Sequence, residues 1–124
     1  MTKRVLIVDD EPNIVISLEF LLKREGFAVS VARDGEEALA AIRAQVPDLV
    51  ILDVMMPKLD GFSVLSAVRA DPAVAAVPVL MLTAKGREAE QKKGLGLGAN
   101  AYLPKPFSTH ELVAKAKALL SGSA

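Results

Sequence analysis

Short apolar runs alternate along the chain with segments whose apolar residues recur every three or four positions. The runs stop at acidic or turn-forming residues, which is typical of buried strands. The three- and four-residue spacing predicts helices that each bury one face. The expected strands are residues 5–8, 27–31, 49–52, 79–82 and 101–103. The expected helices are residues 12–25, 36–44, 62–69, 87–93 and 108–120.

Some expected helix ends carry recognisable signals. Pro12 suits a first helical turn, because proline lacks the amide hydrogen that would be unpaired there. Asp10 or Glu11 is expected to accept hydrogen bonds from the free amides of that turn. Ser108 or Thr109 is the expected cap of the last helix.

The glycine-rich stretch at residues 94–99 superficially resembles a phosphate-binding loop. It follows an expected helix and precedes an expected strand, which is the wrong order for a dinucleotide site. Helix termination and a turn are expected to explain Gly94 and Gly98. Gly96 has no evident packing reason, and we expect it to loosen the end of its helix.

Strands that are apolar throughout, separated by helices, indicate a parallel sheet covered on both faces. The crossovers between such strands are expected to be right-handed. We therefore expect an α/β fold built from five strand–helix units. The length of 124 residues predicts one domain, residues 1–124, with a core at about residues 4–120.

Composition narrows the classes of function. Hydrophobic residues make up 52% of the chain, which is enough to build a core. The 15 basic and 15 acidic residues balance, which argues against nucleic acid as a direct partner. The absence of cysteine excludes disulfides and thiol catalysis, and it fits a reducing, cytoplasmic location. No apolar stretch is long enough for a membrane span, and the first run is too short for a signal peptide.

Acidic residues follow two of the expected strands directly. Asp9 and Asp10 follow the first strand, and Asp53 follows the third. Carboxyl ends of parallel strands meet at one edge of a sheet, where ligands bind in open α/β folds. Thr83 and Lys105 are expected at the same edge. Clustered carboxylates should raise at least one pKa, and Mg²⁺ together with the lysine would relieve their repulsion.

In this combination the chain resembles the receiver domain of bacterial two-component response regulators, from about Arg4 to Leu120. The resemblance implies the flavodoxin-like, chemotaxis-regulator-like fold, with doubly wound strand order 2-1-3-4-5. It depends on four motifs in order, which are Val8-Asp9-Asp10-Glu11, Asp53 with Met56-Pro57 and Asp60-Gly61, Thr83-Ala84, and Lys105-Pro106-Phe107.

The resemblance also implies roles at the phosphorylation site. Asp53 would accept the phosphoryl group from a sensor histidine kinase or a histidine phosphotransfer protein, and the domain would catalyse only its own phosphotransfer and dephosphorylation. Asp10 and Asp53 would bind Mg²⁺ directly, with Asp9 acting mainly through water. The backbone carbonyl of Met55 would be a further ligand. Lys105 would bind the phosphoryl oxygens.

The expected switch connects this site to a partner surface. Thr83 would move toward the phosphoryl group, and Tyr102 would turn inward behind it. The resemblance also implies a cis peptide bond at Lys105–Pro106. The face formed by the fourth helix, fifth strand and fifth helix would then bind a downstream protein.

One subfamily of receivers dimerises through this face, and the sequence departs from its pattern. The acidic pair expected before the tyrosine is replaced by Asn100-Ala101, and Lys115 stands where an arginine is usual. We therefore expect a monomer or a weak, phosphorylation-dependent dimer. The chain is either a single-domain regulator or a receiver from a longer protein.

Three other functions compete with this interpretation. A receiver-like module that binds partners without phosphate would not need the set of Asp10, Asp53, Thr83 and Lys105. A phosphohydrolase of the dehalogenase-like class would want a second aspartate at position 55, which is methionine here. A flavin carrier would want a phosphate-binding loop in place of the acids after the first strand.

Overall fold

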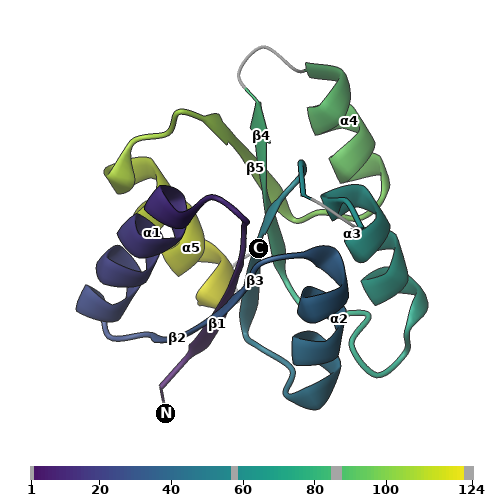
Figure 1. Cartoon of the computed structure of the whole chain (residues 1–124), viewed down its shortest axis with the longest axis horizontal. Helices are drawn as coiled ribbons and strands as arrows, with labels where there is room; N and C mark the ends of the chain where they lie inside the picture. The colour runs from purple at the N-terminus through teal and green to yellow at the C-terminus, as the bar shows by residue number, and fades with distance from the viewer. Residues whose placement is uncertain (1, 57–58, 85–87, 122–124) are drawn as a thin grey trace.

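The computed structural model describes residues 2–56, 59–84 and 88–121 as a sheet between two layers of helices (Figure 1). The five strands are parallel, in the order β2-β1-β3-β4-β5. The strands are β1 (Arg4–Val8), β2 (Ala28–Ala32), β3 (Leu49–Asp53), β4 (Val79–Ala84) and β5 (Ala101–Lys105). The helices are α1 (Pro12–Arg24), α2 (Gly35–Ala44), α3 (Gly61–Ala70), α4 (Glu88–Gly96) and α5 (Thr109–Leu120).

The sheet separates two hydrophobic cores. α1 and α5 cover one face, and α2, α3 and α4 cover the other (Figure 1). Alternate residues of β3 serve the two cores, since Val50 and Leu52 pack on one side and Leu49 and Ile51 on the other. A central strand buried on both faces must be apolar at every position. The predicted α/β class, strand order and doubly wound arrangement are therefore confirmed.

Two strands end two residues later than the apolar pattern predicted, and β2 and β3 end one residue later. β4 continues through Thr83 to Ala84, and β5 continues to Lys105. The register pairs Thr83 with Pro104 and Ala84 with Lys105. Backbone pairing can continue past the last buried side chain, so the apolar pattern alone set both ends too early. As a result, Thr83 and Lys105 are held by the sheet rather than by the loops after it.

The start of α1 differs from the prediction. Glu11 is the N-cap residue, yet its side chain makes no capping hydrogen bond. Instead, Asp9 Oδ1 accepts the Glu11 amide hydrogen at 2.9 Å. The expectation that Asp10 or Glu11 would cap this helix was wrong, because the side-chain hydrogen bond found here joins Asp9 to the amide of the N-cap residue itself. The predicted cap of α5 is confirmed at Ser108, whose Oγ accepts from the Glu111 amide at 3.0 Å.

The glycine-rich stretch at residues 94–99 also differs from the prediction. Gly94 does not end a helix but lies buried within α4, where an added Cβ would be 2.9 Å from Met81 Sδ. Gly94 therefore allows α4 to approach the sheet closely. Gly98 does form the expected turn, with φ of +105°. An added Cβ at Gly96 would meet nothing within 4 Å, which agrees with the absence of a packing role.

Arg69 ties the end of α3 to the loops that lead into β4 and β5. Its Nη1 donates to the carbonyl oxygens of Ala75 and Val77 at 2.9 and 2.7 Å. Its Nε and Nη2 both donate to the Gly98 carbonyl oxygen, at 3.0 and 2.8 Å. Nη2 also donates to Asn100 Oδ1, which accepts the Val79 amide hydrogen as well. Asn100 is thus part of an internal network at the amino-terminal edge of the sheet.

Arg87, the first residue of the predicted fourth helix, lies outside the described residues, as do Lys85 and Pro57. Within the described ranges, no helix combines the length and apolarity that crossing a bilayer would require.

Candidate functional site

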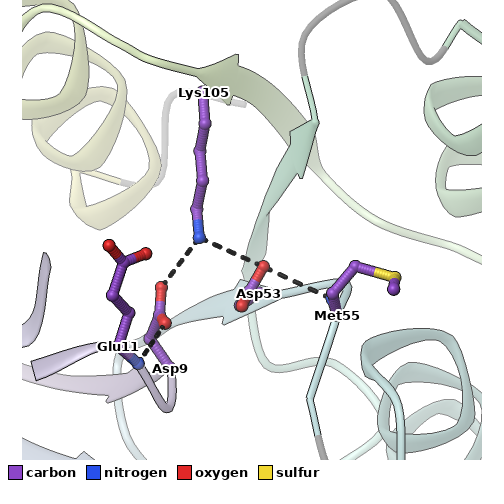
Figure 2. A network of polar contacts seen from close by, with 5 residues as sticks. All are labelled: Asp9, Glu11, Asp53, Met55 and Lys105. Atoms are coloured by element: carbon purple, nitrogen blue, oxygen red, sulfur yellow. Dashed lines mark hydrogen bonds and ion pairs between the residues drawn. The ribbon is translucent and has the colours of Figure 1, made fainter.

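Three strands bring charged side chains to the carboxyl edge of the sheet. Asp53 is the last residue of β3, Lys105 is the last of β5, and Asp9 follows β1 directly. In Figure 2 these three side chains point toward one another. β4 lies between β3 and β5, so the long lysine stem extends across it to reach the acids.

Lys105 forms an ion pair with two buried aspartates. Its Nζ lies 3.2 Å from Asp9 Oδ2 and 3.3 Å from Asp53 Oδ1. Asp9 is fully buried, and Asp53 is 5% exposed. The sequence did not reveal that Lys105 would contact Asp9 directly, because the two residues lie at opposite ends of the chain. Buried charges are unfavourable unless they are paired. Removal of Lys105 would therefore leave two buried carboxylates without their shared counter-ion.

The backbone after Asp53 folds back toward the Asp53 carboxylate. The Met55 amide donates to Asp53 Oδ1 at 3.4 Å, while the Met55 side chain is exposed (Figure 2). The Val54 amide donates to the Leu82 carbonyl oxygen at 3.1 Å, which joins this segment to β4. The phosphoacceptor candidate is thus a nearly buried carboxylate with a backbone amide beside it.

The electrostatics of the site follow from burial and charge. Desolvation by burial, with further repulsion from Asp9, raises the pKa of Asp53 from 3.8 to about 6. Lys105 opposes this effect but does not cancel it. Burial acts to lower the pKa of Lys105, yet the Asp53 and Asp9 carboxylates together outweigh burial and raise it. The pKa of one carboxyl is raised, as expected, but burial contributes more to the rise than the repulsion between carboxylates does.

The acidic residues also meet the requirements of a divalent cation. Asp9, Asp10 and Asp53 each offer a carboxylate oxygen, and these oxygens all lie within 4.8 Å of one another. Asp10 is exposed, so the group opens to solvent on one side. Mg²⁺ prefers a few carboxylate oxygens and keeps several waters. Three carboxylates this close together repel one another, and they form a donor set that such an ion would stabilise.

Thr83 and Tyr102 lie near this group on neighbouring strands. Thr83 is buried at the end of β4, one position beyond Leu82, which pairs with Asp53. Tyr102 lies on β5 opposite Met81 and is half-buried against the core beneath α3 and α4. Neither residue belongs to the polar network of Figure 2. The predicted cis peptide bond between Lys105 and Pro106 is present.

Comparison with known proteins identifies the family. The model of the response regulator receiver domain matches residues 5–117. The chain belongs to this family. The receiver domain is 48% identical to the alkaline phosphatase synthesis transcriptional regulatory protein PhoP of Bacillus subtilis (strain 168), over 99% of this chain and 50% of that protein.

Solved structures agree with this assignment. A protein described as a candidate response regulator from Chloroflexus aurantiacus J-10-fl has a TM-score of 0.94 and 40% identity, covering 98% of this chain and 99% of that one. The receiver domain of sensor histidine kinase PA1611 from Pseudomonas aeruginosa PAO1 has a TM-score of 0.89 and 30% identity, covering 98% and 99%. The latter structure has a magnesium ion coordinated in its active site cleft.

These matches define the class of function. The protein is a receiver domain of two-component signalling systems, the class in which phosphorylation sets the signalling state. It spans about half the length of the Bacillus relative.

Proposed function

We propose that Asp53 accepts a phosphoryl group from a phosphohistidine on a sensor histidine kinase or a histidine phosphotransfer protein. The observation that carries this proposal is the position of the Asp53 carboxylate. It lies at a strand end beside Asp9 and Asp10, within 3.3 Å of the Lys105 ammonium. That arrangement combines an oxygen nucleophile, a cation site and a fixed positive charge, which are the elements of phosphoryl transfer.

The phosphoryl transfer would be a simple displacement at phosphorus. An Asp53 carboxylate oxygen forms a bond to phosphorus as the bond between phosphorus and the histidine nitrogen breaks, and the imidazole leaves with that electron pair. Lys105 stabilises the negative charge on the phosphoryl oxygens. In dephosphorylation, water attacks phosphorus, and the Asp53 carboxylate leaves. The domain would catalyse only its own phosphotransfer and dephosphorylation, so the reaction would set and reset a switch rather than produce a metabolite.

The acidic group supports a role for Mg²⁺. Asp10 and Asp53 would hold the ion directly, Asp9 would act mainly through a bound water, and the Met55 carbonyl oxygen would be a further ligand. When bound, Mg²⁺ would neutralise charge on the carboxylates and on the incoming phosphoryl oxygens. The magnesium ion in the related Pseudomonas aeruginosa receiver domain supports this assignment. Asp9 also holds the Lys105 ammonium, so it links the acidic group to the phosphoryl-binding cation.

A phosphorylation signal would pass from this site through Thr83 and Tyr102. The Thr83 hydroxyl can donate to a phosphoryl oxygen, and its movement would vacate space for the Tyr102 ring. Tyr102 lines a groove of about 490 Å³ together with Leu95 of α4 and Lys115 of α5. The α4–β5–α5 face would therefore change shape and bind a downstream protein, in the cytoplasm where kinases of this class act, without direct contact to nucleic acid.

Intact-mass spectrometry after incubation with acetyl phosphate tests this proposal. The wild-type protein and Asp53→Asn are compared with and without Mg²⁺, because asparagine keeps the shape of the side chain but cannot form an acyl phosphate. One Mg²⁺-dependent phosphoryl adduct in the wild type, lost in the variant, is the expected result. Equal labelling of the variant would contradict the assignment of Asp53.

The same experiment separates the second candidate function. A module that binds partners without phosphate would give no adduct under conditions in which another receiver domain is labelled. It would also fail to bind a beryllofluoride phosphoryl mimic. The ion pairs that join Lys105 to Asp9 and Asp53 disfavour this alternative, since a purely structural site has no need for three buried or half-buried charges.

A further inference from the structure

The segment that follows Asp53 rests against two glycines from different helices. Gly61 is the first residue of α3, and a Cβ there would overlap the Asp53 carbonyl oxygen and lie 2.9 Å from Val54 Cα. Gly35 is the first residue of α2, and a Cβ there would overlap the Leu59 carbonyl oxygen and lie 2.5 Å from Leu59 Cβ. Both glycines are buried. A side chain at either position would require the loop backbone to move.

These contacts differ in their relation to the proposed site. Gly61 follows the Asp60 cap within the motif that continues from Asp53. Gly35 lies on α2, and none of the residues that we assign to the site belongs to this helix. Its neighbour Asp34 accepts the Glu37 amide hydrogen at 2.8 Å, which fixes the start of α2. Gly35 thus lies at a fixed helix start and contacts Leu59, near the end of the loop that follows Asp53.

The near end of the loop is fixed by hydrogen bonds. The Val54 amide is bonded to β4, and the Gly61 amide donates to the Val54 carbonyl oxygen at 2.9 Å. Leu59 lies two residues before Gly61, so its backbone is joined through Gly61 to Val54, and Met55 follows Val54 directly. The Met55 amide reaches the Asp53 carboxylate at a long 3.4 Å, so a small loop displacement would break or tighten this bond.

Small displacements matter at a site of this chemistry. Mg²⁺ requires near-ideal octahedral geometry with oxygen distances of about 2.0–2.1 Å. A misplacement of about 1 Å can cost on the order of 100-fold in the rate of a reaction that depends on orientation. The Asp34 cap and the first helical hydrogen bond hold the start of α2, so we expect relief of the overlap at Gly35 to displace the Leu59 backbone.

We infer that Gly35 is a positioning residue for the phosphorylation site, setting the Met55 backbone through the contact between Gly35 and Leu59. The inference rests on the proposed function of Asp53. It assigns a role in metal binding and phosphotransfer to the start of α2, which holds none of the residues proposed to bind the ion or the phosphoryl group.

The test compares Gly35→Ala with two matched variants. Gly96→Ala adds the same methyl group where nothing lies within 4 Å. Ile42→Val removes a methyl group from the buried face of α2 and controls for a general loss of stability in that helix. Amide NMR spectra are recorded for the metal-free proteins, which are then titrated with Mg²⁺. Phosphoryl uptake from acetyl phosphate is measured in parallel.

We expect Gly35→Ala to shift the Met55 amide signal without metal, to weaken Mg²⁺ binding about tenfold and to slow phosphoryl uptake by a similar factor. Both control variants should stay within about twofold of the wild type for Mg²⁺ binding. An unshifted Met55 amide with unchanged Mg²⁺ affinity would overturn the inference. Failure of the proposed function is a separate result, since the wild type itself would then take up no phosphoryl group.

Leu59→Gly keeps the inference testable if Gly35→Ala does not fold. This variant removes the Leu59 Cβ that rests on Gly35 and frees the loop without crowding α2. The same shift of the Met55 amide and a similar loss of Mg²⁺ affinity are expected. Wild-type values for both quantities in this variant would overturn the inference.

Discussion

The Lys105 ammonium lies 3.3 Å from the Asp53 carboxylate, although the two residues come from strands that are separated by β4. The same ammonium lies 3.2 Å from the fully buried Asp9. One cation therefore compensates two carboxylates before any metal or phosphoryl group binds. This relationship links the stability of the fold to the chemistry of the site.

Removal of the Lys105 charge should destabilise the metal-free protein. In Lys105→Ala, Asp9 and Asp53 lose their shared counter-ion in a buried setting, which should cost about 2–3 kcal/mol at pH 7.5. Urea unfolding in EDTA measures this loss, and added Mg²⁺ should restore part of it. The exposed Lys23, paired with Glu19 at 3.4 Å, is the control, and Lys23→Ala should cost at most about 0.5 kcal/mol. Equal losses would contradict a special role for Lys105.

Lys105→Ala should also separate phosphorylation from signalling. Asp53 keeps its carboxylate in this variant, so weak phosphoryl uptake from acetyl phosphate should remain. The lysine that would bind the phosphoryl oxygens is gone, so the α4–β5–α5 face should not respond. Amide NMR spectra of the phosphorylated variant check this prediction. A full wild-type response on that face would show that Lys105 is not needed for the switch.

The raised pKa of Asp53 predicts that the metal-free protein loses stability as pH rises. The folded-state pKa of about 6 lies above the ordinary value of 3.8, so the folded state binds more protons between these values. The stabilisation is complete below about pH 4 and is lost as pH rises through 6, by at most about 3 kcal/mol. Urea unfolding in EDTA at several pH values measures the change.

Asp53→Asn isolates this contribution, because asparagine does not titrate. The variant and the wild type should differ little near pH 4, and the variant should become the more stable protein by pH 7.5. A stability difference that stays constant across this range would show that Asp53 does not titrate with a raised pKa.

Thr83→Ala should leave phosphorylation largely intact while blocking its structural consequence. The buried Thr83 hydroxyl is not the nucleophile, so phosphoryl uptake should stay within a few-fold of wild type. Without that hydroxyl, the Tyr102 ring signals should not move when beryllofluoride is added with Mg²⁺. Thr83→Ser, which keeps the hydroxyl, should restore the movement. A Tyr102 response in Thr83→Ala equal to that of the wild type would remove Thr83 from the switch.

The two glycines of α4 should respond oppositely to alanine. Gly96→Ala adds a methyl group in open space and should stabilise the protein by about 0.5 kcal/mol, because alanine favours the helix. Gly94→Ala should destabilise it, since the new Cβ would lie 2.9 Å from Met81 Sδ. Thermal unfolding gives the signs. Hydrogen exchange over residues 92–97 tests whether Gly96 loosens α4, and protection equal to that of the core in the wild type would refute it.

Arg69→Lys should destabilise the fold although the charge is kept. Lysine cannot reproduce the planar guanidinium, which donates to three carbonyl oxygens and to Asn100 Oδ1. The expected loss in the free energy of unfolding is about 2 kcal/mol. Arg43→Lys is the matched control, because Arg43 makes one exposed ion pair with Asp71 at 3.2 Å. Chemical unfolding compares the two variants. Similar small losses in both would mean that the Arg69 network contributes little.

The sequence alone predicted the architecture and the acidic group at the carboxyl edge of the sheet. The apolar runs and the helical spacing between them identified every strand and helix, because burial on one or both faces imposes a period on the side chains. The acids at two strand ends then placed Asp9, Asp10 and Asp53 together, since carboxyl ends of parallel strands share an edge.

Only the tertiary structure decided the contacts between distant residues. No periodic pattern in the sequence predicts these contacts. They are the ion pair of Lys105 with Asp9, the hydrogen bond from the Glu11 amide to Asp9, the hydrogen bonds of Arg69, and the close contacts of Gly35 with Leu59 and of Gly94 with Met81. Each depends on the distance between backbones that the packing of the sheet and helices sets. A local pattern reports which face of an element is buried, but it does not report which atoms of another element lie against that face.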